Sequence, residues 1–169
     1  SREDAEIEVI EEGSKGFLGV FGAKNAVVNV KKKFNPEKIA SDFLREVFIS
    51  MGLIVKIDTK LKDKQLSITI SGDDMGIIIG KRGQTLDSIQ YLTSLVVNKG
   101  NAGYVRVKVD TENYRARRKE TLENLAKNIA FKVKRTKKPV FLEPMNPYER
   151  RVIHSALQND PLVSTHSEG

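Results

Sequence analysis

Two glycines bracket two cations in the segment Gly80-Lys81-Arg82-Gly83, which lies directly before an amphipathic segment that predicts a helix. Glycine tolerates positive φ and lets a ligand approach the backbone closely. The N–H groups and the dipole at the start of a helix favour a phosphate there. The side-chain charges of Lys81 and Arg82 add to that field. The spacing therefore predicts a loop that binds the phosphate backbone of a nucleic acid.

A Gly-x-x-Gly spacing can also occur without any ligand, because a lone pair of glycines often only turns the chain. A second glycine cluster at Lys15–Gly22 opens into a strand-like run, where no helix supports phosphate binding. A Walker A loop requires four residues between its first glycine and Gly-Lys-Ser/Thr. Here three residues separate Gly76 from Gly80, and Arg82 replaces the magnesium-binding hydroxyl. The Walker A motif is therefore excluded.

A second pair of binding side chains is Arg150 and His154, which lie four residues apart on a predicted helix and therefore share one face. Arginine offers a planar fork of donors to a phosphate, and histidine can stack on a base or bond a phosphate. The alternative is an ordinary solvated face. Asn146-Pro147 predicts the start of this helix, and Glu149 at the third position predicts a capping box.

The residues needed for catalysis are missing from the sequence. It has no Cys, two His, no His-Glu-x-x-His and no complete P-loop. We therefore expect no enzyme activity, no catalytic residues, no cofactor and no metal site. The lack of Cys excludes disulfides and favours a reducing compartment, so we expect a cytoplasmic protein.

The hydropathy of the chain and its first residues bear on whether it is a membrane or a secreted protein. No stretch is long and apolar enough to span a bilayer. The first residues do not form a signal peptide. The sequence begins at Ser1 without an initiator Met, which predicts that it is a fragment.

Charge is distributed unevenly over the 169 residues, whose net charge is +7. Residues 1–35 carry six cations and six anions, whereas residues 111–169 carry twelve cations and seven anions. A basic face favours a polyanion, either nucleic acid or an acidic membrane surface. A merely solvated surface is the alternative.

The first elements are two predicted strands, at residues 5–10 and 25–33. Two strands do not make an independent core, so they either belong to a partial domain or dock on the next region of the chain. Phe17, Leu18, Val20 and Phe21 lie among the glycines between them. They predict either a loop with its own small core or an exposed apolar knob for a protein partner.

The middle of the chain predicts an α+β unit. Asn35-Pro36 begins a helix that Gly52 ends. Its apolar face comprises Ile39, Phe43, Val47 and Met51, with Leu44 and Phe48 beside them. Alternating residues then predict strands at 53–57 and 66–71. A short turn at 73–79 and the glycine loop precede a helix at 84–98 with an apolar stripe. A third strand at 104–110 completes three strands with helices on one face. The stripe of the second helix comprises Leu86, Ile89, Leu92 and Val96.

The last third predicts a helix from residue 112 to 135 and the Asn146 helix, joined by an extended link that begins at Lys138. The first turns of the long helix are crowded with cations, which are unfavourable at a helix start. A partner that neutralises them would account for this cluster. The alternative is that the helix continues from elsewhere or begins later. The apolar stripe of the long helix comprises Leu122, Leu125, Ile129 and Val133. The crowded residues are Tyr114, Arg115, Arg117, Arg118 and Lys119.

The order of elements in residues 36–110, with Gly-Lys-Arg-Gly between two helices, closely resembles a KH domain of the prokaryotic type (helix-strand-strand-helix-helix-strand). KH domains clamp about four nucleotides by their backbone with this loop. The resemblance implies that Gly80, Lys81, Arg82 and Gly83 contact nucleic acid.

Residues 113–165 resemble the R-x-x-x-H single-strand nucleic-acid-binding domain, whose motif falls on Arg150 and His154. With the glycine-rich segment in front, the chain resembles the Jag/KhpB (SpoIIIJ-associated) family over nearly its whole length. We expect a partial Jag-type N-terminal domain at 1–34, a KH domain at 35–111, and an α+β R-x-x-x-H domain at 112–169 that is incomplete at its C-terminal end.

The family resemblance implies a non-catalytic protein that binds single-stranded RNA and regulates it post-transcriptionally, with links to cell-envelope or sporulation physiology. Single-stranded DNA stays an alternative, since only contacts to the 2′-OH separate the two. Another alternative is an interaction adaptor for a membrane insertase or a second KH protein. A homodimer also stays open.

Overall fold

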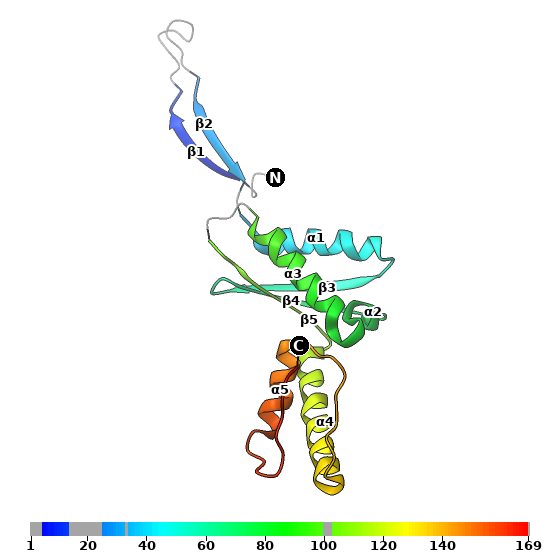
Figure 1. Ribbon diagram of the computed structural model, residues 1–169. Helices are drawn as coiled ribbons and strands as arrows, with labels where there is room; N and C mark the ends of the chain where they lie inside the picture. The colour runs from blue at the N-terminus through cyan, green and yellow to red at the C-terminus, as the bar shows by residue number, and fades with distance from the viewer. Residues whose placement is uncertain (1–4, 14–24, 33, 100–102, 169) are drawn as a thin grey trace, which may run out of the picture.

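The chain forms three successive regions in the computed structural model, which describes residues 5–13, 25–32, 34–99 and 103–168. A two-stranded ribbon comes first, a unit of helices on a three-stranded sheet follows, and two helices end the chain (Figure 1). The predicted α+β class is confirmed. The glycine-rich segment Lys15–Gly22, with the predicted apolar knob or loop core, lies outside the described residues.

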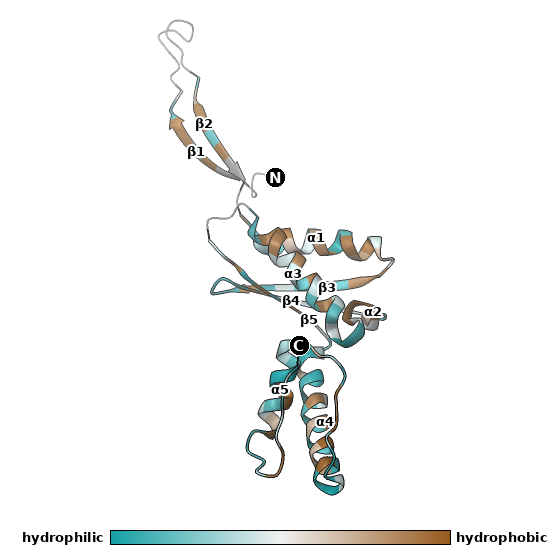
Figure 2. Ribbon diagram, viewed as in Figure 1, coloured by the Kyte–Doolittle hydropathy of each residue, from teal (hydrophilic) through white to brown (hydrophobic). Residues whose placement is uncertain are grey.

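The ribbon consists of β1 (Ala5–Glu11) and β2 (Val27–Lys32), which pair antiparallel with Ile7 opposite Val30. It extends away from the helices of the second region (Figure 1). Its apolar side chains are exposed, by 51% at Ile7 and 59% at Val30. Brown bands mark hydrophobic positions along the ribbon of both strands (Figure 2). The strands therefore do not dock on the next region of the chain, which was one of the two alternatives for them.

Helix α1 (Pro36–Ser50) begins as predicted, because the Asn35 side chain accepts a hydrogen bond from the Lys38 N–H at 3.0 Å. Two residues of the predicted apolar face, Leu44 and Phe48, are confirmed as buried. The others are not: Ile39, Phe43 and Val47 are only partly buried, and Met51 lies beyond the last turn with 40% of its surface exposed. The small Ala40 lets the helix approach its neighbours along another line. The buried residues are Pro36, Ala40, Leu44 and Phe48.

The sheet has the order β3-β4-β5. Strands β3 (Val55–Lys62) and β4 (Gln65–Gly72) form an antiparallel hairpin whose two turn residues, Asp63 and Lys64, have φ of +48° and +61°. Positive φ at both positions is typical of the two-residue hairpin turn that matches the twist of strands. Strand β5 (Arg106–Thr111) pairs parallel to β4, one to two residues later than predicted.

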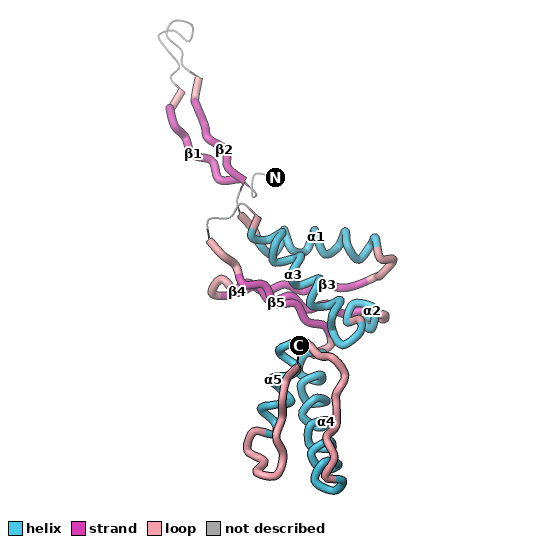
Figure 3. The backbone as a smooth tube through the Cα atoms, in the orientation of Figure 1, coloured by secondary structure: helices cyan, strands magenta, loops and turns pink. Residues whose placement is uncertain are grey.

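Two helices cover one face of this sheet, as predicted: α1 and α3 (Gln84–Asn98) (Figure 3). The bounds of α3 are confirmed, but the second half of its stripe is not, because Thr93 and Val97 are buried while Leu92 is 49% exposed. The Thr93 hydroxyl donates to the Ile89 carbonyl at 2.7 Å, which satisfies a polar group inside the core.

The last region contains α4 (Tyr114–Thr136) and α5 (Pro147–Leu157), which pack side by side. The link between them runs back along α4, so that both helices begin at the end nearest the sheet (Figures 1 and 3). Within residues 112–168 the structure describes helices and no strand. Among the described residues, no helix combines the length and apolar character needed to cross a lipid bilayer.

The core of the last region follows the predicted line on α4 at Leu122 and leaves it beyond that residue. Ala126 and Ala130 are buried, whereas Leu125 is only partly so. Alanines allow α5 to approach α4 closely, and this decides which face is covered. The buried residues of this core are Leu122, Ala126, Ala130, Val152, Ile153 and Leu157.

Candidate nucleic-acid interface

The Gly80–Gly83 loop connects α2 (Met75–Ile79) to α3 through a single turn of 3-10 helix, labelled η2 (Lys81–Gly83). Three of its four residues have positive φ: +67° at Gly80, +57° at Arg82 and +81° at Gly83. Residues with a Cβ rarely adopt this conformation, so the two glycines are needed where they stand. The predicted placement of the loop between two helices is confirmed.

The glycines also make room for the protein's own side chains. A Cβ on Gly80 would lie 2.7 Å from the Thr85 Cβ, and a Cβ on Gly83 would lie 2.7 Å from Cε1 of Tyr114. The prediction that both glycines leave space for a ligand is therefore wrong at Gly83, which is buried against the Tyr114 ring. Burial raises the pKa of the Tyr114 phenol above its usual value.

The backbone N–H groups of the loop that no described residue accepts lie at its centre. The Gly80 N–H bonds the Gly76 carbonyl at 2.9 Å, and the Gly83 N–H reaches the Gly80 carbonyl at 3.5 Å. Neither Lys81 nor Arg82 donates its backbone N–H to another of the described residues. The Lys81 side chain is exposed. Two successive free N–H groups beside an exposed ammonium can bind a phosphate.

Arg82 does not extend freely from the loop. Its guanidinium forms an ion pair with Glu143 and donates through Nη1 to the Pro144 carbonyl at 2.6 Å. Both partners belong to the link between α4 and α5, so the loop is tied to the last region of the chain. No local pattern of residues signals this contact, because Arg82 and Pro144 are 62 residues apart.

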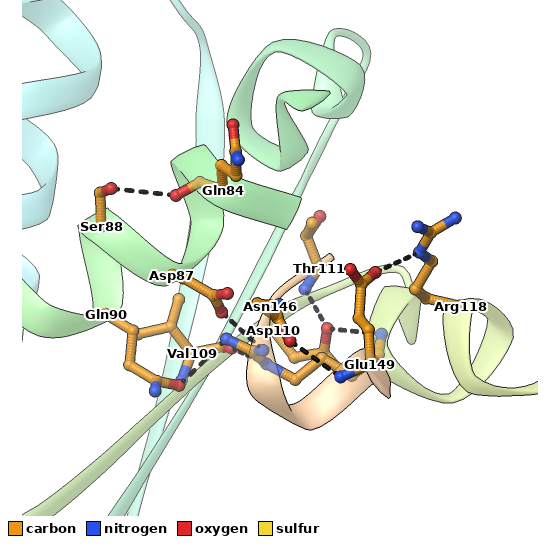
Figure 4. A network of polar contacts seen from close by, with 11 residues as sticks. Gln84, Asp87, Ser88, Gln90, Val109, Asp110, Thr111, Arg118, Asn146 and Glu149 are labelled. Atoms are coloured by element: carbon orange, nitrogen blue, oxygen red, sulfur yellow. Dashed lines mark hydrogen bonds and ion pairs between the residues drawn. The ribbon is translucent and has the colours of Figure 1, made fainter. Parts of the chain in front are cut away.

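The cations in the first turns of α4 have carboxylate partners within the chain. Arg115 pairs with Asp87 at 2.8 Å, and Arg118 pairs with Glu149 at 2.7 Å. The explanation by a neutralising partner is therefore not needed for Arg115 and Arg118, because carboxylates of the same chain pair with them. Figure 4 shows the carboxylates of Asp87 and Glu149 directed toward this end of α4. Weaker pairs join Arg117 to Glu112 at 3.3 Å and Lys119 to Glu123 at 3.7 Å.

The start of α5 has the predicted cap with one difference. The Asn146 side chain accepts from the Glu149 N–H at 2.8 Å, as predicted. The Glu149 carboxylate does not complete a capping box and instead accepts from Nε of Arg118 (Figure 4). Because Glu149 is only 4% exposed, this ion pair lies inside the contact between the two helices.

Arg150 and His154 both lie on α5, as predicted. The Arg150 guanidinium donates to the Met145 carbonyl at 3.0 Å, and His154 Nδ1 lies 2.6 Å from the Thr165 hydroxyl. His154 is exposed and Arg150 is partly buried. No hydrogen bond or ion pair joins either of them to residues 80–83 in the described chain. The structure thus places two candidate contact regions on separate elements.

Sequence reasoning missed two residues of the interface, Tyr114 and Glu143, as partners of the loop. Tyr114 packs on Gly83 and Glu143 pairs with Arg82. The one available signal was local: an aromatic side chain sits among the arginines at the start of α4, where its ring can pack against a glycine. Nothing in the sequence pointed to Glu143.

Comparison with known proteins finds three families along the chain. Residues 1–32 match the Jag N-terminus, residues 37–109 match the KhpA/KhpB KH domain, and residues 120–169 match the R-x-x-x-H domain. None of these three domain families is named for an enzyme activity.

Three relatives that each match at least three quarters of this chain share one name, RNA-binding protein KhpB. The chain is 60% identical over 164 residues to RNA-binding protein KhpB of Clostridium symbiosum, covering 96% of this chain and 73% of that protein. It is 40% identical over 171 residues to RNA-binding protein KhpB of Bacillus subtilis (strain 168), covering 100% of this chain and 82% of that protein. The protein of that name from Lactiplantibacillus plantarum is 36% identical over 128 residues, which cover 76% of this chain and 40% of the relative.

Proposed function

This chain belongs to the KhpB family, and on that premise we propose that it is a non-catalytic protein that binds single-stranded RNA. The observation that carries the proposal is the centre of the Gly80–Gly83 loop. There the exposed Lys81 ammonium lies beside two backbone N–H groups that no described residue accepts. Charge and free amides together favour phosphate over water.

Arg150 and His154 on α5 supply a second contact with the same strand. Arg150 is fixed by the Met145 carbonyl through one nitrogen of its guanidinium, so its other donors stay available to a phosphate. His154 is exposed and can stack on a base. Two contacts on one chain raise the effective concentration of the strand at each of them.

The test compares Lys81→Asp with Lys60→Asp in gel shift or fluorescence anisotropy with a labelled single-stranded RNA. Lys60 lies on β3 near the hairpin turn, at the other end of the sheet from the loop, and the charge change is the same. Lys81→Asp is expected to weaken binding at least about tenfold, which corresponds to about 1.4 kcal/mol. Lys60→Asp is expected to bind nearly as the parent chain does. Equal affinities would reject the loop as the binding element.

Lys81 is changed alone because Arg82 also holds the link between α4 and α5. A double change at both cations would mix lost phosphate contacts with a displaced link. The same titration with single-stranded DNA of equal sequence tests the sugar preference, since contacts to the 2′-OH separate the two.

The cellular role that we propose is post-transcriptional regulation in the cytoplasm, linked to cell-envelope or sporulation physiology. The family resemblance supports it. Crosslinking RNA to the chain in cells and mapping the bound sequences tests it. Bound fragments enriched in messages for envelope or spore proteins would support the link, whereas a random sample of abundant RNA would contradict it.

A second candidate is an adaptor for another protein, and the exposed apolar side chains of β1 and β2 favour it. The partners that the resemblance implies are a membrane insertase, a second KH protein or a second copy of this chain. A pull-down against one partner chosen in advance should still recover that partner after nuclease treatment. The double variant Ile7→Ser with Val30→Ser should no longer recover it. Loss of the partner on nuclease treatment would show that RNA bridges the two proteins, which contradicts the adaptor role.

A further inference from the structure

A groove of about 390 Å³ lies where the glycine loop meets the first two turns of α4. Gly80 and Arg82 line it on one side. The other side is a single face of α4, because its residues follow one another at intervals of three and four. These α4 residues are Tyr114, Arg117, Arg118 and Thr121.

Three arginines line this groove, and each has one carboxylate partner. Arg118 pairs with Glu149, whose side chain is 5% exposed. Arg82 pairs with Glu143 and Arg117 pairs with Glu112, and these two carboxylates are 74% and 50% exposed. Exposed ion pairs contribute little and exchange partners readily. The groove therefore has one fixed pair and two pairs that an incoming anion can replace.

We propose that this groove binds a phosphate of the RNA strand next to the segment held by Lys81. The proposal rests on the proposed function and extends its binding site onto α4. Arg82 and Arg117 exchange their exposed carboxylates for phosphate oxygens, while Arg118 stays with Glu149 and holds the two helices together. Thr121 also lines this face, and its hydroxyl donates to the Arg117 carbonyl at 2.9 Å.

Glu143 and the Pro144 carbonyl occupy the donors of Arg82 when no RNA is bound. A carboxylate offers arginine the same two-oxygen geometry as a phosphate. Glu143 therefore competes with the strand, and its removal should strengthen binding. This is the opposite of the effect expected from removing a residue that contacts the ligand.

The first test is Arg117→Glu in the full chain, with Lys127→Glu as the matched control, measured by fluorescence anisotropy with a labelled single-stranded RNA at physiological salt. Arg117 is 58% exposed, so the change does not threaten folding. Lys127 is an exposed residue ten positions further along α4, about 15 Å along the axis, beyond the screening length. Arg117→Glu should weaken binding about tenfold and Lys127→Glu less than about threefold.

The second test is Glu143→Gln, with Glu46→Gln as its control. Glu46 is exposed on α1, on the other side of the sheet unit from α4 (Figure 1). Glu143→Gln should bind RNA about two- to fivefold more tightly, the range expected when an exposed ion pair stops competing. Glu46→Gln should bind as the parent chain does.

The outcomes separate this inference from the proposed function. If Arg117→Glu and Lys127→Glu bind equally while Lys81→Asp loses affinity, the groove is rejected and the loop stands. If Glu143→Gln binds no more tightly than Glu46→Gln, the competing role of Glu143 is rejected. A parent chain that binds no single-stranded RNA would overturn the groove and the proposed function together.

Discussion

Gly83 is the residue on which the loop and the last region of the chain both depend. Its φ of +81° lets the chain enter α3, and its missing Cβ leaves the place taken by the Tyr114 ring. A glycine that would usually be assigned to ligand binding therefore has a packing role as well. The Lys81 side chain stays exposed, and no described residue accepts from its backbone N–H.

Replacing Gly83 should lower the free energy of unfolding by more than the strain of its positive φ alone explains. Gly52 is a matched control, because its φ of +71° is similar and nothing lies within 4 Å of a Cβ there. Gly52→Ala should lose about 1–2 kcal/mol of unfolding free energy from strain. Gly83→Ala should lose a further 1–3 kcal/mol or so from the clash with Tyr114. Urea titration of both variants measures the difference, and equal losses would show that the ring simply moves aside.

The sequence carried enough local information to place the loop and both caps. Asn35 and Asn146 cap their helices by bonds to the third residue beyond, a pattern that depends only on neighbours. The positive φ of Gly80 and Gly83 likewise follows from residue type and position. By contrast, the partner of Arg118 is 31 residues away, and its geometry exists only after α4 and α5 have packed.

At the scale of elements, small residues explain why the predicted apolar stripes were partly wrong. Ala126 and Ala130 are weakly hydrophobic, so a stripe drawn through large side chains passes beside them. They become buried because α5 needs close approach along α4. Thr93 on α3 was missed for a related reason, since its hydroxyl is satisfied inside its own helix. Packing against a second element therefore decided these positions.

The two helices of the last region are also joined at the far end of α4. Lys134 lies 2.5 Å from a carboxylate oxygen of Asp160, which follows α5 and also accepts from the Leu162 N–H at 3.2 Å. The hydrogen bond from Lys134, followed by that from the Leu162 backbone, lowers the pKa of Asp160 below its usual value. The carboxylate is therefore the form that stabilises the folded chain.

This contact should make stability depend on pH in one direction. A lowered folded-state pKa gives a contribution that is present above the usual aspartate pKa of about 3.9 and is lost as pH falls through the folded-state value. Asp160→Asn should therefore be less stable than the parent chain at neutral pH, and the gap should close as the pH falls below the folded-state pKa of Asp160. Thermal melts across this range measure it.

The control for that prediction is the same change in a Lys134→Met background. The gap at neutral pH should shrink there, because the largest cause of the lowered pKa is gone. A gap that stays constant from neutral to acid pH would show that the side chain acts by packing and not by its charge.

At the scale of the whole molecule, the loop and the α5 face lie in successive regions, and the ion pair between Arg115 on α4 and Asp87 on α3 ties these regions together. A strand long enough to reach both should bind far more tightly than one that reaches the loop alone. The tie limits how far the two regions can separate, so the second contact forms at a high effective concentration.

RNA length should therefore control affinity in steps. An RNA of about four nucleotides fills the loop alone, and RNAs long enough to reach α5 should bind about 10²–10⁴-fold more tightly. Arg150→Ala with His154→Ala should remove that gain and leave tetranucleotide binding unchanged. Anisotropy with a length series measures both effects. A smooth rise with length that the α5 changes do not alter would place the second contact elsewhere.

The strand order of the sheet has a consequence for how the chain is made. β4 is the central strand, and its partner β5 follows only after the whole of α2, the loop and α3. While the ribosome adds those residues, one edge of β4 stays open, and an open apolar edge can pair with another chain. The nascent chain passes this vulnerable stage only when residue 111 has emerged. Tyr114, which packs on Gly83 of the loop, follows three residues later.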